Sequence, residues 1–478
     1  MKKLFYILAI LSLSSCAATN QEKKEIIILS TNDMHAKIDN YAKVAAYVDK
    51  VRSENKNVLL LSGGDMFSGN PIVDKYHEKG SPMVELMNKI GYQYAPFGNH
   101  EFDYGQEILA KRIEQANFQM LCANIKISEE SPIKKPEPYV IFDLDGIAVC
   151  LLSTIQVGNS NGKLIPSTHP DKVLGIDFFQ PVEAHEEYKY LRKKCDLFVS
   201  LNHNGVDADF ILANKMPELD VIVGGHTHTR IDTGMLVNGV LITQAECHLK
   251  YIGKTTITFE DKKIISKKNE LINVAELTDE NEEIKSMIAE YYEKSPLKEV
   301  VGAAIEDFEG KENLGGLMTD AITAIHNLDI AFQNSGGIRV NKIEKGNITL
   351  AQIYELDPFD NEVVAFEMSY DELYSLIKNS HRGGRKNADL MVSGITYTIK
   401  MKNDKVEDIK MFTLDGKLLD KNKMYKVGMN SYISSSYKFD HKDAGKSLYM
   451  TSAETLEEYL KQQKEVKPSA DRTKVEEI

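Results

Sequence analysis

The chain has 478 residues, 42% of them hydrophobic, so it is too long for one ordinary core and two globular domains are expected. Its formal net charge of −13 argues against a nucleic-acid backbone as the main partner, because like charges repel. An anionic small substrate would therefore need local positive charge, from metal ions or from a placed arginine.

The first sixteen residues are predicted to be an export signal and not part of the fold. A basic start, Met1–Lys3, precedes an apolar run from Leu4 to Leu13, and about ten apolar residues are too few to span a bilayer. The Leu-Ser-Ser-Cys that ends at Cys16 resembles a bacterial lipobox, which implies cleavage before Cys16 and lipidation of its thiol. The alternative is a plain secretory signal with an incidental cysteine.

A lipid on Cys16 would hold the protein at a membrane of the cell envelope through a short polar tether, residues 17–24. No later run approaches about 18 apolar residues, so no segment is expected to span the bilayer. The residues Ala17–Thr19 lack the aspartate that retains enterobacterial lipoproteins at the inner membrane, which favours the outer membrane. We make no prediction of the oligomeric state.

The cysteines after Cys16 do not reveal a pairing scheme, because connectivity cannot be read from spacing. Cys150 lies in the apolar run Ile147–Leu152, so we expect it to be a small core residue. No Cys-x-x-Cys pair occurs, and a thiolate metal site is therefore not expected. The remaining cysteines are Cys122, Cys195 and Cys247.

Strands and helices are predicted to alternate along residues 25–275, which indicates an α/β domain. The first strand is the β-branched run Glu25–Thr31, and the spacing of apolar residues predicts a helix over Tyr41–Asn55. The strand Asn57–Ser62, the helix Pro82–Ile90 and the strand Tyr94–Phe97 follow. Further strands are predicted at Val140–Phe142, Ile147–Ser153, Leu197–Leu201, Val221–Val223 and Val240–Thr243.

A charged helix, Asp279–Glu293, is predicted within a linker that covers residues 276–298, and its alternative interpretation is a surface helix of the first domain. Residues 299–478 are predicted to form a smaller α+β domain. Its predicted elements are the helices Leu314–Ile325 and Tyr370–Asn379 and the strands Ile330–Gln333, Ile395–Met401 and Tyr425–Met429. The charged tail beyond Lys461 is expected to be mobile.

Side chains that can bind metals lie at the ends of five predicted strands, where ligands of α/β sheets gather. Asp33 and His35 are two residues apart, so in an extended segment both side chains point to one side. Oxygen and nitrogen ligands without thiolate suit Zn, Mn, Fe, Co or Ni. The candidate ligands are Asp33, His35, Asp65, Asn99, His203, His226 and His228. Alone, most of these segments are more often a turn or a loop, and the pair His226 and His228 is as often a metal site, but five at consecutive strand ends indicate a metal centre.

These segments resemble the calcineurin-like metallophosphoesterases and, more narrowly, the 5′-nucleotidase/UDP-sugar hydrolase branch. The matching stretches are Thr31–His35, Gly64-Asp65, Gly98–Asp103, His203 and Gly225–His228. The resemblance implies a four-layer α/β/β/α sandwich that holds two divalent metal ions, such as Zn, Mn or Co. It implies that Asp33, His35, Asp65 and His228 hold one ion, and that Asp65, Asn99, His203 and His226 hold the other. It also pairs His100 with Asp103 as a catalytic dyad.

The stretch Asn334–Arg339 contains Gly336 and Gly337, whose backbone N–H groups could face an anion, and Arg339 to support them. A Gly-Gly turn before a strand is the simpler interpretation. The stretch nevertheless resembles the Asn-x-Gly-Gly-Ile-Arg motif of the 5′-nucleotidase C-terminal domain, and Asp357–Asn361 resembles that domain's Pro-Phe-Gly-Asn segment. The implied substrate-binding residues are Asn334, Gly336, Gly337, Arg339, the stacking ring Phe359, Asn361, and Tyr432 as a second stacking ring.

Two departures from the family pattern affect the predicted nucleoside pocket. The stretch Ser434–Lys438 replaces a Gly-Gly-Asp segment, so the ribose-binding carboxylate is missing, and Asp440 is an unaligned substitute. Lys311 lies near a position where an arginine would be expected.

These features predict an exported, lipid-anchored phosphoesterase with two metal ions that hydrolyses 5′-nucleotides to nucleoside and phosphate for scavenging. His100, oriented by Asp103, would stabilise developing charge and protonate the leaving oxygen. The alternatives keep the metals and act on 2′,3′-cyclic nucleotides, UDP-sugars or another phosphoester, or capture a nucleotide without turnover. The expected partners are a small-molecule nucleotide and a membrane, and not a nucleic acid.

Overall fold

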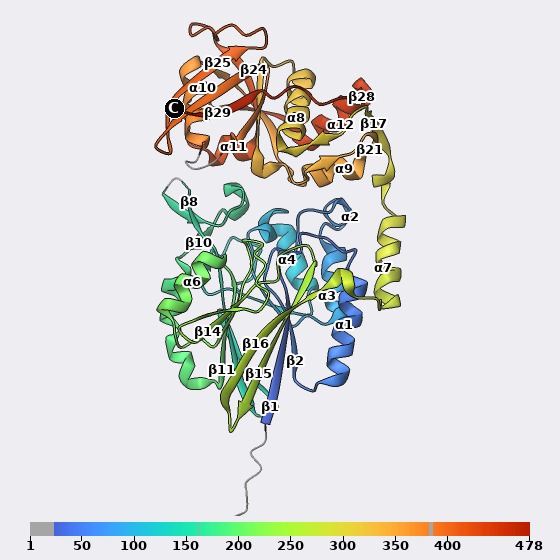
Figure 1. The fold of residues 1–478 in the computed structure, drawn as a ribbon, viewed down its shortest axis with the longest axis vertical. Coiled ribbons are helices and arrows are strands. Elements are labelled where there is room, and N and C mark those ends of the chain that lie inside the picture. Colours follow the sequence, from blue (N-terminus) through green and yellow to red (C-terminus); the bar gives the residue numbers. More distant parts are fainter. Residues whose placement is uncertain (1–22, 161, 382–385) are drawn as a thin grey trace, which may run out of the picture.

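The structure, a computed structural model, describes residues 23–160, 162–381 and 386–478. The predicted export signal, Cys16 and residues 17–22 of the tether lie outside the described residues. Two domains are stacked along the long axis of the molecule, and helix α7 (Glu282–Glu293) runs along one side between them (Figure 1). No helix in the described ranges is long and apolar enough to cross a membrane.

The first domain contains two six-stranded mixed sheets, the first with antiparallel strands at one side and the second with an antiparallel strand at each edge. The first sheet has the order β16 (Lys263–Asn273), β15 (Tyr251–Glu260), β1 (Lys23–Thr31), β2 (Val58–Ser62), β3 (Tyr94–Pro96), β4 (Gln119–Leu121). The second has the order β13 (Met235–Val237), β14 (Val240–Thr243), β12 (Val221–Val223), β11 (Leu197–His203), β7 (Ile147–Ile155), β6 (Tyr139–Leu144). The parallel strands β1–β4 end at one edge, as do β7, β11, β12 and β14.

The two sheets pack face to face, because alternate residues of each strand point to opposite faces. Ile26 and Ile28 of β1 join the core between the sheets, whereas Ile27 and Leu29 join the core under the helices. Those helices are α1 (Tyr41–Glu54), α3 (Ser81–Ile90) and α4 (Gln106–Gln115). On the outer face of the second sheet lie α5 (Pro181–Glu187) and α6 (Val206–Lys215). The expected four-layer α/β/β/α sandwich is confirmed.

Helix α7 fits both interpretations of its sequence, as a linker between the domains and as a surface helix of the first domain. Its buried residues Ile284, Ile288 and Tyr291 belong to the helix-covered core of the first domain, and the helix contacts α1 and α3. Asn281 caps it by accepting hydrogen bonds from the N–H groups of Glu283 and Ile284. The helix therefore packs on the first domain while it carries the chain to β17 (Val300–Ala304).

The second domain is built on a five-stranded sheet in the order β23 (Leu390–Ser393), β19 (Ile330–Asn334), β26 (Tyr425–Asn430), β22 (Glu362–Met368), β27 (Lys446–Thr451). Its helices are α8 (Gly310–His326), α9 (Leu350–Leu356), α10 (Tyr370–Ser380), α11 (Ser431–Ser436) and α12 (Ser452–Gln463). A second sheet has the order β25 (Lys405–Thr413), β24 (Ile395–Lys402), β29 (Thr473–Glu477), and a third contains β17, β21 (Gly346–Thr349) and β28 (Glu465–Val466). The separate α+β domain is confirmed.

The prediction of a mobile tail was wrong. Residues 473–477 form β29, which pairs in parallel with β24, and Val475 packs against the core of that domain. Arg472 anchors the start of the strand, because its guanidinium lies 2.6 and 3.1 Å from the two carboxylate oxygens of Asp320. The high charge density of the tail concealed this strand.

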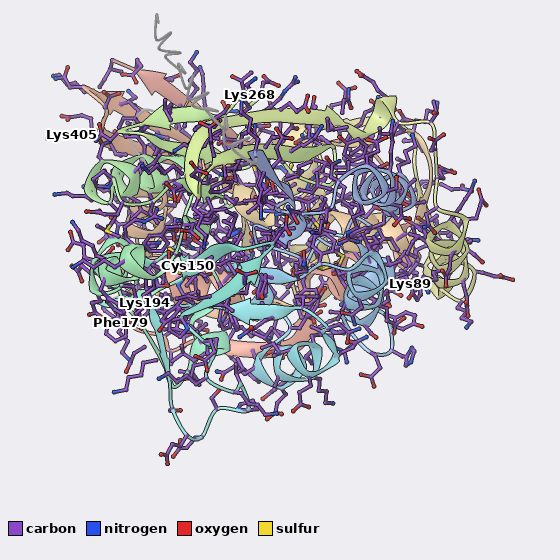
Figure 2. The ribbon with its side chains drawn as sticks, turned by 90° about the horizontal axis from the view of Figure 1, so that it is seen from below. Lys89, Cys150, Phe179, Lys194, Lys268 and Lys405 are labelled. Atoms are coloured by element: carbon purple, nitrogen blue, oxygen red, sulfur yellow. The ribbon has the colours of Figure 1, made fainter. Side chains whose placement is uncertain are left out.

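The cysteines after Cys16 are free thiols, and Cys122, Cys150 and Cys247 are buried. Seen from below the molecule, Cys150 lies among the strands, while Lys89, Lys194, Lys268 and Lys405 lie toward the periphery (Figure 2). The expectation that Cys150 is a core residue is confirmed.

Candidate metal centre and interdomain cleft

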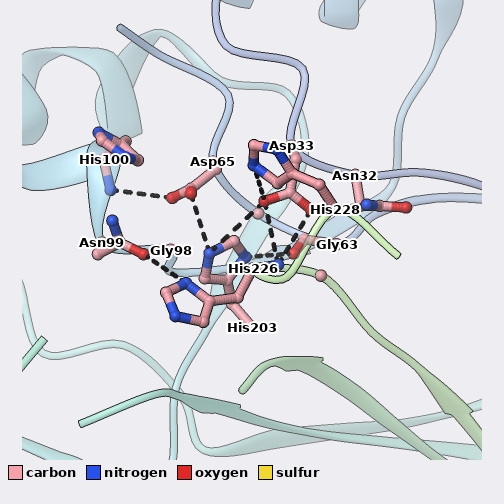
Figure 3. A network of polar contacts seen from close by, with 12 residues as sticks. Asn32, Asp33, Gly63, Asp65, Gly98, Asn99, His100, His203, His226 and His228 are labelled. Carbon is pink, nitrogen blue, oxygen red and sulfur yellow. Dashed lines mark hydrogen bonds and ion pairs between the residues drawn. The ribbon is translucent and has the colours of Figure 1, made fainter. Parts of the chain in front are cut away.

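The candidate metal ligands converge from the carboxyl ends of five strands of the two sheets (Figure 3). Asp33 and His35 follow β1, Asp65 follows β2 and Asn99 follows β3. His203 is the last residue of β11, so the structure places it inside a strand that was predicted to end at Leu201. His226 and His228 follow β12. The structure thus brings all seven residues to one place.

Asp33, His35 and His228 form one group of ligand atoms that lie within 4.8 Å of one another. The Nε2 atoms of His35 and His228 are 3.1 Å apart, and His228 Nε2 lies 3.4 Å from Asp33 Oδ1. Two nitrogen ligands at about 2.0–2.1 Å from one zinc ion lie about 3.0–3.4 Å apart. The spacing of this group therefore fits one divalent ion.

Asp65, His203 and His226 form a second group within the same limit of 4.8 Å. Asp65 Oδ2 is 3.0 Å from His203 Nε2, and Asn99 Oδ1 is 3.0 Å from His226 Nδ1. Asp65 Oδ2 is also 3.9 Å from His35 Nε2 in the first group. The Asp65 carboxylate therefore stands between the two groups, as a bridging ligand would.

The electrostatics of this cluster also fit bound cations. Burial lowers the pKa of His203, but the carboxylates of Asp65, Asp33 and Glu101 outweigh it and raise the pKa to about 10. His203 Nε2 nevertheless lacks a well-aligned hydrogen-bond acceptor. Burial raises the pKa of Asp65, yet His203 and His100 hold it well below its usual value. The buried carboxylates of this cluster therefore favour a positive charge between them. Ligands that bind through oxygen and nitrogen atoms suit divalent ions such as zinc.

Five of the candidate metal ligands have a strained, left-handed backbone. Non-glycine residues with left-handed φ values are uncommon and cost of the order of 1–3 kcal/mol each. Such strain persists only where the surrounding structure holds it, and it gathers at functional sites. The strained residues and their φ angles are Asp33 (50°), His35 (48°), Asp65 (53°), His226 (79°) and His228 (53°).

Glu101 supports the loops that carry Asp65 and Asn99, a role that ligand spacing alone did not reveal. Its carboxylate accepts hydrogen bonds from the backbone N–H groups of Gly98 (2.6 Å), Asp65 (3.1 Å) and Met66 (2.7 Å). Burial and the charge of Asp65 raise the pKa of Glu101 to about 7. The signal in the sequence was its place within the stretch Gly98–Asp103.

His100 and Asp103 form a hydrogen-bonded pair at the rim of the cluster, with 2.6 Å between Nδ1 and Oδ2. Burial lowers the pKa of His100, but Asp103 and Asp65 outweigh that effect, so the pKa lies above its usual value. The imidazole is therefore held in a form that can donate a proton.

A cleft of about 850 Å³ opens between the domains and joins this cluster to the predicted substrate residues. The first domain contributes Asp65, Asn99, His100, Asp103, His226 and His228 to its lining. The second contributes Asn334, Gly336, Gly337, Arg339, Phe359, Asn361 and Tyr432. All seven predicted substrate residues thus face the same cavity as the metal cluster.

Phe359 and Arg339 reach across the cleft toward the first domain. The Phe359 ring is near parallel to that of His100, with centroids 6.0 Å apart, and the Arg339 guanidinium lies 5.7 Å from the Phe359 ring. A Cβ at Gly337 would lie 2.5 Å from Nε2 of the buried Gln333, so that side chain would have to shift. Asn430 holds Asn334 through a 2.9 Å hydrogen bond to its Oδ1.

The structure shows where the residues that depart from the family pattern lie relative to the cleft. Ser434 and Ser435 of α11 line the cleft where a carboxylate was expected. Asp440 is not in the cleft lining and instead accepts a 3.1 Å hydrogen bond from Ser375, so it is not a substitute. Lys311 donates a 2.7 Å hydrogen bond to the Ser335 carbonyl, beside the predicted anion-binding turn.

An interdomain ion-pair cluster was not predicted. Asp360, next to Phe359, accepts hydrogen bonds from Lys75, at 2.6 Å, and from Lys79. Lys75 and Lys79 follow the short helix α2 (Pro71–Asp74) of the first domain, so only the domain arrangement brings the three together. No local signal in the sequence pointed to this contact.

Comparison with protein families identifies both domains. Residues 26–230 match the family described as calcineurin-like phosphoesterase, and residues 298–438 match the 5′-nucleotidase C-terminal domain.

Individual relatives agree with those matches. The 5′-nucleotidase of Vibrio cholerae serotype O1 is 30% identical over 78% of this chain and 80% of that protein. The trifunctional nucleotide phosphoesterase protein YfkN of Bacillus subtilis is 27% identical over 86% of this chain. This chain spans about a third of YfkN and of a second B. subtilis relative, endonuclease YhcR (32% and 37%).

Among solved structures, the 5′-nucleotidase precursor of Thermus thermophilus superposes with a TM-score of 0.81 at 26% identity, over 95% of this chain and 99% of that chain. Sequence matches to both domains and a common fold thus converge on one result: the chain belongs to the 5′-nucleotidase family of metal-dependent phosphoester hydrolases.

Proposed function

We propose that this protein is an exported, lipid-anchored 5′-nucleotidase that uses two divalent ions to convert 5′-nucleotides to nucleoside and phosphate for scavenging. The observation that carries the proposal is the shared cleft, where both ligand groups and the His100–Asp103 pair face Arg339, Phe359 and Tyr432. A phosphate at the metal cluster and a base between the aromatic residues would occupy one continuous cavity.

The proposed ligand sets share Asp65. Asp33, His35, Asp65 and His228 would hold one ion, and Asp65, Asn99, His203 and His226 the other. When bound, two such ions would polarise the phosphoryl group and make water a competent nucleophile at neutral pH.

Side chains of both domains would bind the nucleotide and protonate the leaving group. Arg339 would balance the charge of the phosphate from the side of the second domain. His100, held by Asp103, would donate its proton to the leaving ribose oxygen. Phe359 and Tyr432 would stack on the base, and Asn334 and Asn361 would supply hydrogen bonds.

Replacing one proposed metal ligand and the proposed proton donor tests the roles assigned to them. Asp65→Ala should lose metal and activity together, because its carboxylate serves both groups. His100→Ala should lower kcat by about 10²–10⁴-fold with metal content unchanged, since only proton transfer is lost. The measurements are metal content by elemental analysis and phosphate release from 5′-AMP. An active Asp65→Ala protein would contradict the bridging role.

Substrate class is tested by chromatographic detection of the products formed from 5′-AMP, UDP-glucose and a 2′,3′-cyclic nucleotide, after EDTA treatment and readdition of Mn or Zn. Bis-p-nitrophenyl phosphate serves as a generic diester, and a single-stranded RNA tests the expected absence of a nucleic-acid partner. Rapid turnover of 5′-AMP supports the proposal. Turnover of the generic diester alone would retain the metal centre and reject the nucleotide pocket.

Export and anchoring rest on the sequence up to Cys16. The expected result is incorporation of labelled fatty acid into the wild-type protein and its loss in Cys16→Ala. A membrane-bound, labelled Cys16→Ala protein would contradict the anchor.

A further inference from the structure

A segment outside the predicted site touches both the dyad and the second domain. Ser167, Thr168 and His169 lie between β9 (Lys163–Ile165) and the short 3-10 helix Pro170–Val173, and all three line the cleft. Each makes a hydrogen bond to a different part of the site or to the opposite domain.

Thr168 fixes the orientation of the Asp103 carboxylate. Its hydroxyl is buried with the side chain (5% exposed) and donates a 3.1 Å hydrogen bond to Asp103 Oδ1. The other oxygen, Oδ2, is the one that bonds to His100. A carboxylate rotates over a broad range about its terminal bond, so a partner on each oxygen holds Oδ2 toward the imidazole.

Ser167 fixes the orientation of the Asn99 amide. Its backbone carbonyl accepts a 3.2 Å hydrogen bond from Asn99 Nδ2. An amide has one donor end and one acceptor end, so holding Nδ2 away directs Oδ1 toward His226, 3.0 Å distant.

His169 connects the segment to the second domain. Its Nδ1 accepts the backbone N–H of Asp171 at 3.2 Å, which leaves Nε2 as the donor of a neutral ring. Nε2 lies 3.2 Å from the hydroxyl of Ser435, which donates in turn to the Ser431 carbonyl. Ser435 belongs to α11, the helix that also places Tyr432 in the cleft.

We propose that Ser167–His169 is a positioning segment that couples closure of the second domain to the geometry of the catalytic dyad. Thr168 is a positioning residue that acts through Asp103, and the His169–Ser435 hydrogen bond holds the segment in place only while α11 is docked. The inference rests on the proposed function, because it assumes that His100 serves the reaction.

The first test compares Thr168→Val, which keeps the shape and removes the hydroxyl, with Thr168→Ser, which keeps the hydroxyl. The matched control is Thr258→Val, which removes a similar 3.2 Å hydrogen bond from a threonine to Glu25, far from the cleft. With 5′-AMP, Thr168→Val should lower kcat about tenfold while KM and metal content stay unchanged. Thr168→Ser should restore most of the rate, and Thr258→Val should behave as wild type. Equal kcat for Thr168→Val and wild type would overturn the role, as would a serine variant as slow as the valine variant.

The second test asks whether the His169–Ser435 contact and the Thr168–Asp103 contact affect kcat together. It compares Ser435→Ala with the double variant Thr168→Val/Ser435→Ala. If the segment transmits closure, the double variant should be no slower than Thr168→Val alone, because both changes release the same carboxylate. Ser435→Ala alone should also lower kcat, so a wild-type kcat in Ser435→Ala, or fully multiplicative effects in the double variant, would refute the coupling.

His100→Ala, measured alongside, separates failure of the dyad from failure of the positioning segment. A fully active His100→Ala protein would remove the proposed role of the dyad itself. An impaired His100→Ala protein with an unaffected Thr168→Val protein would overturn the positioning segment alone.

Discussion

Replacing Gly98 with alanine tests whether the metal cluster depends on close approach of the Asp65 and Asn99 loops. A Cβ at Gly98 would lie 2.3 Å from Asp65 Oδ1, 2.5 Å from the Asp65 backbone nitrogen and 2.6 Å from Glu101 Oε2. Ordinary van der Waals contact begins at 3.4 Å, so the Asp65 carboxylate must shift by roughly 1 Å.

The shift cannot be absorbed by a flexible side chain. Two of the three contacted atoms, the Asp65 nitrogen and Glu101 Oε2, are hydrogen-bonded to each other, and the third, Asp65 Oδ1, accepts the backbone N–H of His100. A misplacement of about 1 Å at a reacting centre costs about 10²-fold in rate, and overpacking a buried site costs about 1–3 kcal/mol of stability.

The assay combines phosphate release from 5′-AMP, metal content and thermal unfolding of Gly98→Ala. We expect kcat to fall about 100-fold, bound metal to decrease and the Tm to drop. Gly158→Ala is the matched control, because a Cβ there meets no atom within 4 Å. Wild-type metal content and turnover in Gly98→Ala would refute the reasoning.

Three further outcomes are expected. Asp360→Asn should raise KM for 5′-AMP, because Lys75 and Lys79 lose the carboxylate charge that joins them to the Phe359 loop. Burial raises the pKa of Asp360, but the two lysines outweigh it and lower the pKa. A depressed carboxyl pKa stabilises the contact above the unfolded value of about 3.9, so in wild type it weakens as the pH falls below about 4. A urea titration at pH 3 and pH 7 that shows equal effects of Asp360→Asn would contradict this. Arg472→Ala should lower the free energy of unfolding by about 1.5–3 kcal/mol in urea, since Asp320 loses the two hydrogen bonds that Arg472 donates and keeps only that from Ser393. EDTA should abolish phosphate release and Mn or Zn should restore it, whereas EDTA-resistant activity would contradict metal dependence.

Local pattern was enough to predict most of the fold and the residues of the candidate site. The run at Glu25–Thr31 and the helical spacing after Tyr41 became β1 and α1 within a few residues. Asp33, Asp65 and His226 could be grouped together from their positions along the chain, because strand ends in an α/β sheet meet at one edge.

Side chains with no local pattern were missed. Thr168 and Lys75 stand in ordinary loop sequence, and nothing near them indicates a partner. Their partners, Asp103 and Asp360, are 65 and 285 residues away along the chain. The tail after Lys461 was misjudged for the same reason, since β29 is stabilised by β24 and Asp320 and not by its own composition.

The amino-acid order alone therefore specified the chemistry of this protein: which groups can bind metal, which histidine is left over, and which stretches alternate as strand and helix. These properties depend on residue type and on spacings of a few residues, so they can be recognised in the amino-acid sequence. Only the tertiary structure decided that Asp360 meets Lys75 and Lys79 across the domains, that Asp440 lies outside the cleft, and that Thr168 holds Asp103. Such contacts depend on how two sheets and two domains pack, and packing joins residues whose separation along the chain carries no information about their distance in space.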